Sequence, residues 1–108
     1  MVFIRHILEE IRYLVQESEG LEYKDFVNNE TLKRAFVRSL EVIGEATKNV
    51  SAEFRERYPN IKWREMAGLR DKLIHHYFGV NLKRVWDVVV TQIPKLKAQI
   101  GVILKEKW

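Results

Sequence analysis

Residues that interrupt helices are scarce in this sequence, and their scarcity restricts the folds that the chain can adopt. The 108 residues include five glycines and two prolines, so long stretches run without a helix breaker. Along these stretches apolar residues recur at three- and four-residue spacing, which is the period of an amphipathic helix. No strand-like alternation of apolar and polar residues competes with this pattern. We therefore expect an all-α protein.

Four long segments carry the helical period, and shorter helical pieces are expected between them. Short pieces are predicted around Tyr23, Phe26 and Val27 and after Ser51, whose side chain can cap a helix start. The long segments cover residues 3–16, the stretch that begins after Asn28 or Asn29 and includes Val50, residues 62–78, and the stretch from Asn81 almost to Trp108. The sequence thus predicts one domain, residues 1–108, folded as an antiparallel up-and-down four-helix bundle with additional short helices.

Three residues mark where these segments should end or deform. Gly44 lies in the middle of the second segment, where glycine costs about 1 kcal/mol relative to alanine, so we expect another helix to pack closely against it. Pro94 lies inside the fourth segment and removes a backbone hydrogen bond, which predicts a kink near residues 91–93. Gly79 is the expected C-terminal stop of the third segment.

Cysteine content and charge narrow the classes of function. Cysteine is absent, which excludes disulfides, thiolate metal sites and cysteine nucleophiles and fits a cytoplasmic protein. No apolar run approaches the roughly 20 residues of a membrane span, and Arg5 interrupts the apolar start of the chain, so no signal peptide is expected. The net charge of +4 permits an anionic partner such as RNA without requiring one.

The third segment carries a charge where its apolar stripe predicts an apolar side chain. At about 100° per residue, Arg70 shares a face with Trp63, Met66, Ala67, Leu73, Ile74 and Tyr77. A guanidinium stays charged and is costly to bury without a partner, so Arg70 must pair with a carboxylate, line a subunit interface or face a wet cleft. A structural ion pair or a snorkelling side chain is the plainer alternative. Glu41 and Glu45 can pair with Arg70 or Arg38, or can simply be solvated.

Two histidines follow this arginine. His75 lies one helical turn after Asp71, whose carboxylate can orient the imidazole. Paired histidines near a helix end are nevertheless typical of a polar surface. A metal site is not expected, because His75 and His76 point about 100° apart, His6 is the only other histidine, and no His-Glu-x-x-His pattern is present. No cofactor is expected either.

The sequence RDKLIHHY at residues 70–77 resembles the Arg-x4-His-x-Tyr motif of HepT-type toxins, which belong to the HEPN superfamily of helical ribonucleases. Its context is similar as well. The matching stretches are SLEVIGEA at residues 39–46, FRERYP at 54–59, WREMAGLR at 63–70 and YFGV at 77–80. The resemblance runs from about Ile4 to Leu104, nearly the whole chain, and this extent makes it specific.

The resemblance implies a metal-independent endoribonuclease toxin that acts as a homodimer, with two motifs facing one another across a shared cleft. By motif spacing Arg70 and His75 would be the catalytic residues, with Asp71 and Tyr77 in support, and His76 is the alternative acid or base if the helix is distorted. The implied partners are an RNA substrate and a small nucleotidyltransferase antitoxin, which silences the toxin by transferring AMP to Tyr77. Whether dimers pair further stays open.

Metal-free RNA cleavage suits these residue types. The ribose 2′-hydroxyl must lose a proton, the leaving 5′-oxygen must gain one, and charge on the phosphorane must be stabilised. A histidine can move the protons, and an arginine can hold phosphate oxygens. On one regular helix Arg70 and His75 point about 140° apart, whereas Arg70 and Tyr77 nearly align. The length of the arginine, a distorted helix end or a site shared between subunits would close this gap.

Two other functions fit the same sequence. The bundle could be a non-catalytic binding subunit that partners a nucleotidyltransferase, or a structural dimer with a degenerate site. Lys72, Lys83 and Arg84 lie near the motif and can either meet RNA phosphates or be solvated.

Overall fold

The structure, a computed structural model, describes residues 2–73 and 81–107, and the regular elements in that part of the chain are all helices. The long ones are α1 (Val2–Ser18), α3 (Glu30–Lys48) and α8 (Ile93–Lys107). The shorter ones are α2 (Tyr23–Val27), α4 (Ala52–Arg57), α5 (Trp63–Ala67), α6 (Leu69–Leu73), α7 (Leu82–Asp87) and the π-helical turn η2 (Val88–Gln92). The all-α prediction is confirmed. None of the helices described is long and apolar enough to cross a membrane.

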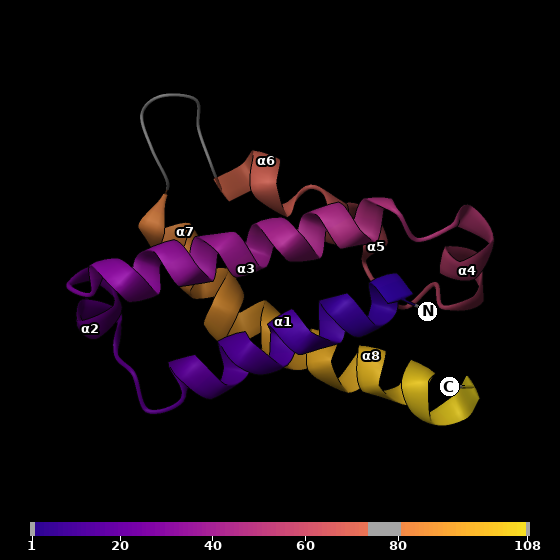
Figure 1. Cartoon of the computed structure of the whole chain (residues 1–108), viewed down its shortest axis with the longest axis horizontal. Coiled ribbons are helices and arrows are strands. Elements are labelled where there is room, and N and C mark those ends of the chain that lie inside the picture. Colours follow the sequence, from indigo (N-terminus) through magenta and orange to yellow (C-terminus); the bar gives the residue numbers. More distant parts are fainter. Residues whose placement is uncertain (1, 74–80, 108) are drawn as a thin grey trace.

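The helices run up and down around one core (Figure 1). α1 packs against α3 and α8, and α3 also contacts α5 and α6. Figure 1 shows α3 antiparallel to α1, and α5 and α6 running back along α3. α7, η2 and α8 follow one another directly and form the last arm. The bundle therefore has four antiparallel arms, with α2 and α4 as the additional short helices.

The core consists of side chains that the helical period places on inner faces. Fully buried members come from each of the long helices and from α7 and η2: Ile7, Ile11, Leu14, Phe36, Ile43, Val85, Val89, Ile93 and Ile100. At one end of the bundle Phe26 of α2 stacks on Phe36 and Trp86, with ring centroids 5.2 and 5.5 Å apart. Aromatic contacts of this kind add to the stabilisation from buried area, so α2 closes that end of the core.

Polar residues begin three helices where the sequence predicts a start. The side chains of Asn29, Ser51 and Asn81 each accept a hydrogen bond from the backbone N–H three residues later, at 3.0, 3.1 and 3.1 Å. Each bond satisfies one of the free N–H groups at a helix N-terminus. Of the two asparagines that could begin α3, Asn29 is therefore the one that caps it.

The third segment differs from its prediction because it is not one continuous helix. α5 ends at Gly68, whose N–H bonds to the carbonyl of Arg64 at 3.1 Å, and α6 begins at the next residue. A methyl group placed on Gly44 of α3 would lie 3.5 Å from the carbonyl oxygens of Met66 and Ala67. The close helix packing expected at Gly44 is thus confirmed, and it occurs where α5 gives way to α6. The predicted continuation to residue 78 and the stop at Gly79 lie outside the described residues.

The fourth segment contains the disturbance expected from Pro94, in the form of a π-turn. Proline has no N–H, so the i→i−4 ladder loses a bond at this position. The N–H of Ile93 bonds instead to the carbonyl of Val88, five residues earlier, and α8 continues from there. Figure 1 shows the ribbon changing direction between α7 and α8. π-turns are recognised causes of such bends.

Candidate active site

The arginine singled out in the sequence pairs with a carboxylate across two helices. Arg70 lies on α6, and its Nε atom is 3.4 Å from Oε2 of Glu41 on α3. The Arg70 side chain is 51% exposed and that of Glu41 is 26% exposed. Of the outcomes that the sequence left open for Arg70, pairing with a carboxylate is confirmed, and Glu41 is the partner. The guanidinium remains half in solvent, where an incoming anion can reach it.

The prediction that Arg70 lies on the apolar stripe is wrong. Trp63 and Met66 are buried as expected, but the next buried position is Leu69, which is 5% exposed, and Arg70 faces outward. The break at Gly68 is the cause, because it changes the angular relation between residues before and after it. Arg70 is therefore a surface arginine held by an acid, not a charge forced into a core.

Gly44 brings the two members of the pair together. It lies one turn after Glu41 on α3, and its missing side chain lets the backbone of the α5–α6 junction approach α3. A methyl group on Gly44 would also lie 3.9 Å from the backbone nitrogen of Arg70. The start of α6 is thus packed on α3 within one turn of Glu41, which is why the side chains of Arg70 and Glu41 can meet.

A hollow of about 430 Å³ adjoins Glu41 on the outer side of α3. It is lined by Glu30, Lys33, Arg34, Val37, Glu41 and Leu82. Lys33 pairs with Glu30 at 3.2 Å, while Arg34 is exposed and has no ion-pair partner among the described residues. The hollow therefore places Lys33 and Arg34 beside the acid that holds Arg70, and Arg34 is the lining cation without an ion pair among the described residues.

Of the other predicted site residues, the structure describes Asp71 alone. Asp71 is exposed on α6. His75, His76 and Tyr77 lie outside the described residues, so the Asp71–His75 contact and the angle between Arg70 and His75 stay predictions. Across residues 2–73 and 81–107 the structure contains no cluster of three or more His, Asp or Glu side chains able to hold a metal ion.

A comparison with known protein families identifies the family of the chain. A family model described as Ribonuclease HepT-like matches residues 4–103. The chain belongs to this family. The match includes nearly all of α1, all of α2 to α7, most of α8 and every residue of the Arg70–Tyr77 motif.

Several relatives of the HepT-like chain are named as ribonucleases. A "putative RNase" of Caldanaerobacter subterraneus is 48% identical over 105 residues, 97% of this chain and 94% of the relative. A "putative RNase" of Methanocaldococcus jannaschii is 44% identical over 104 residues, 96% of this chain and 86% of the relative. A "probable ribonuclease HepT" of Thermococcus cleftensis is 39% identical over 103 residues, 95% of this chain and 94% of the relative. No solved structure matches the chain significantly.

Two features of the site were not found from the sequence. The sequence did not predict Arg34 and Lys33 as site residues, although both lie about two turns before Glu41 on α3 and so near it along the helix surface. The break at Gly68 was also missed, although a glycine inside a helical pattern is a recognised signal for a helix end.

Proposed function

We propose that this HepT-like chain is a metal-independent endoribonuclease toxin of the cytoplasm, with Arg70 and His75 as its catalytic residues. The observation that carries the proposal is the Arg70–Glu41 pair, which holds a half-exposed guanidinium beside a hollow lined by Lys33 and Arg34. The family and the names of its relatives support RNA as the substrate.

Glu41 leaves most of the guanidinium available. It contacts Arg70 through Nε at 3.4 Å, and the Arg70 side chain is still 51% exposed. The two terminal nitrogens of the guanidinium are suited to two oxygens of one phosphate. Glu41 therefore acts as a positioning residue, because it holds the guanidinium at Nε.

The reaction follows from what arginine and histidine supply. The 2′-oxygen attacks the adjacent phosphorus as its proton passes to a base, the bond from phosphorus to the 5′-oxygen breaks, and the 5′-oxygen takes up a proton. His75 serves one or both proton transfers, since imidazole titrates near neutral pH. Arg70 stabilises the charge that develops on the phosphorane oxygens. Because the nucleophile is a 2′-hydroxyl, DNA is not a substrate.

A homodimer provides the geometry that one helix does not. On a regular helix the directions of Arg70 and His75 differ by about 140°, so a shared cleft would combine Arg70 of one protomer with the histidine of its partner. Tyr77, with Asp71, supports this site. Transfer of AMP to Tyr77 by a nucleotidyltransferase antitoxin would place bulk and negative charge where the RNA phosphate binds, and so silence the enzyme.

The catalytic assignment is tested by cleavage of single-stranded RNA with purified protein in the presence of a chelator. We expect Arg70→Ala and His75→Ala each to lower the rate by about 100-fold or more, whereas Arg64→Ala removes an exposed arginine of α5 and should leave it unchanged. Full activity in both site variants would refute the mechanism.

The partner assignment has a separate test. Co-expression with a nucleotidyltransferase should add whole adenylyl groups to the intact mass of the chain, and Tyr77→Phe should abolish the addition. A protein that never cuts RNA yet co-purifies with the nucleotidyltransferase would instead support the non-catalytic binding subunit. An unmodified Tyr77 in an inhibited complex would overturn the AMP switch.

A further inference from the structure

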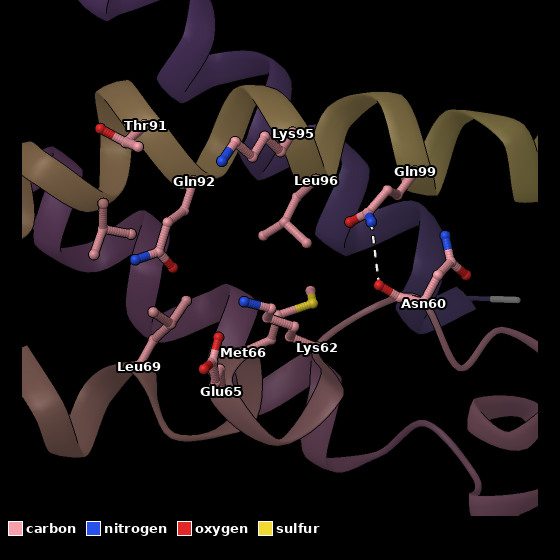
Figure 2. A pocket seen from close by; sticks show the side chains of 11 residues that line it. Asn60, Lys62, Glu65, Met66, Leu69, Thr91, Gln92, Lys95, Leu96 and Gln99 are labelled. Carbon is pink, nitrogen blue, oxygen red and sulfur yellow. Dashed lines mark hydrogen bonds between the residues drawn. The ribbon is translucent and has the colours of Figure 1, made fainter.

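A second cleft lies between α5 and the η2–α8 arm, and it shares no residue with the Arg70–Glu41 pair or with the hollow on α3. Its volume is about 400 Å³, within the range of small-molecule sites. Figure 2 shows Gln92 and Leu96 reaching from one wall toward Lys62 and Met66 on the other, with Lys95 at the rim. The nature of these groups indicates what the cleft can bind.

The cleft owes one wall to the π-turn. Gln92 is the last residue of η2, and Lys95 and Leu96 follow in the first turn of α8. π-turns are frequent at functional sites, because they change the direction of side chains inside a helix. Where α8 faces the α4–α5 connection, the Gln99 amide donates a hydrogen bond to the backbone carbonyl of Asn60 at 3.2 Å. This bond ties the two walls together at one end of the cleft.

The charged side chains of the cleft are not neutralised by ion pairs. Lys62 and Lys95 stand on opposite walls, both are exposed, and neither forms a salt bridge within the described part of the chain. Glu65, which also lines the cleft, is likewise without an ion-pair partner there. The cleft therefore offers two cationic groups and one carboxylate, a net positive charge open to an anionic ligand.

The rest of the lining is apolar or amide, apart from the hydroxyl of Thr91. Met66 and Leu96 are 2% and 8% exposed and form an apolar base between the lysines. Gln92 and Gln99 contribute amides, which both donate and accept hydrogen bonds. A ligand that uses all of these features has an anionic group, a flat apolar body with polar edges, and hydroxyls.

We propose that this cleft binds a nucleotide. Its phosphate would lie between Lys62 and Lys95, because ammonium groups bind phosphate as point charges. Its base would pack on Met66 and Leu96. The carboxylate of Glu65 would accept hydrogen bonds from ribose hydroxyls. The nucleotide is either free in solution or part of an RNA strand; in the second case the proposal rests on the proposed ribonuclease function.

The test is binding to the intact, full-length chain, measured by calorimetry and by NMR shifts of labelled protein. The probes are AMP, GMP, CMP and UMP, their 2′-deoxy forms, inorganic phosphate, and an RNA oligonucleotide with 2′-O-methyl groups, which cannot be cleaved. The variant Lys62→Ala/Lys95→Ala is compared with Arg64→Ala/Lys97→Ala. The control removes two exposed, unpaired cations from the same two arms of the bundle, each two residues along from a cleft lysine.

We expect at least one ribonucleotide to bind and to shift amide signals of α5, η2 and α8. Loss of both cleft lysines should weaken that binding by at least about tenfold, and the control by less than about twofold. Binding of the oligonucleotide alone, with the same dependence on Lys62 and Lys95, would assign the cleft to a nucleotide of the RNA strand.

Three results would overturn the proposal: no binding of any probe, equal weakening in the two double variants, or binding of inorganic phosphate as tight as that of the nucleotides. Equal affinity for ribose and deoxyribose forms would overturn the role of Glu65, which Glu65→Gln tests directly. None of these measurements involves cleavage. An inactive Arg70→Ala enzyme that still binds nucleotides would separate this cleft from the proposed catalytic site.

Discussion

The α5–α6 and α7–α8 arms were each predicted as a single helix, and each contains a residue that disturbs helices, yet they respond differently. At Gly68 the helix ends and restarts, and Leu69 becomes buried where the regular period placed Arg70. At Pro94 a π-turn absorbs the disturbance, and the helix continues with Val89, Ile93 and Leu96 still buried. The helical spacing of apolar residues therefore continues across Pro94, but it does not continue across Gly68.

The difference follows from what each arm packs against. α5 is five residues long, and an isolated helix of that length is not stable alone, so its contact with α3 at Gly44 positions the α5–α6 junction. The π-turn is followed by fifteen residues of α8 that pack on α1, and this longer contact keeps its apolar seam facing the core. The surface position of Arg70 thus depends on how the α5–α6 junction packs on α3 at Gly44.

The neighbouring residues Leu69 and Arg70 give the largest expected effect. Leu69 is 5% exposed, so Leu69→Ala should lower the free energy of unfolding by about 2–5 kcal/mol. Arg70 is half exposed in its pair with Glu41, and Arg70→Ala should cost at most about 1 kcal/mol. Urea unfolding of the two variants measures the difference.

The opposite order of stability would mean that the apolar stripe continues through Gly68 and that Arg70 is the inward residue. The same two variants separate folding from function. Arg70→Ala should be folded and inactive, whereas Leu69→Ala should retain RNA cleavage in proportion to the fraction of protein that remains folded.

Gly44 gives the next largest effect, because its contact sets the position of α6. Gly44→Leu would force a branched side chain against the carbonyls of Met66 and Ala67, and overpacking of this kind costs about 1–3 kcal/mol. Gly44→Ala adds a methyl at an ordinary contact distance of 3.5 Å and should raise stability by up to about 1 kcal/mol through helix propensity. Thermal unfolding and RNA cleavage should change together in the leucine variant, since it also displaces Arg70 from Glu41. A Gly44→Leu variant that is more stable than the parent would show that the α5–α6 junction does not pack closely on α3.

Most of the fold was predictable because local signals and burial agree in it. The spacing of apolar residues predicts the buried faces of α1, α3 and α8. Residue type predicts the helix caps at Asn29 and Ser51 and the close packing at Gly44. The break at Gly68 was not predicted: a glycine inside a helical pattern can end a helix or be tolerated in it, and here the junction packs on Gly44 of α3, which is far away in sequence. Here tertiary contact overrides the continuous period.

The sequence predicted Arg70 as a residue of the candidate site, but it did not predict the surroundings of that residue. Arg70 and its need for a carboxylate came from the sequence, and Glu41 was among several open partners. The prediction that Arg70 lies inside an apolar stripe was wrong, and no sequence pattern predicts the hollow lined by Lys33 and Arg34. The buried position lies one residue earlier than predicted, at Leu69 instead of Arg70. His75 and Tyr77 stay predictions that rest on the motif.

Pro94 gives the smallest expected effect and tests the other arm of the comparison. A proline inside an ordinary helix costs about 3 kcal/mol, so its replacement by alanine would normally stabilise strongly. Here the N–H of Ile93 already bonds to Val88 across the π-turn, and proline also lowers the entropy of the unfolded chain by an equivalent of about 0.4–1 kcal/mol. Pro94→Ala should therefore change the free energy of unfolding by less than about 1 kcal/mol. An increase of about 3 kcal/mol in the free energy of unfolding would mean that the π-turn relieves none of the cost of the proline. The α7–α8 arm would then be interrupted at Pro94, as the α5–α6 arm is at Gly68.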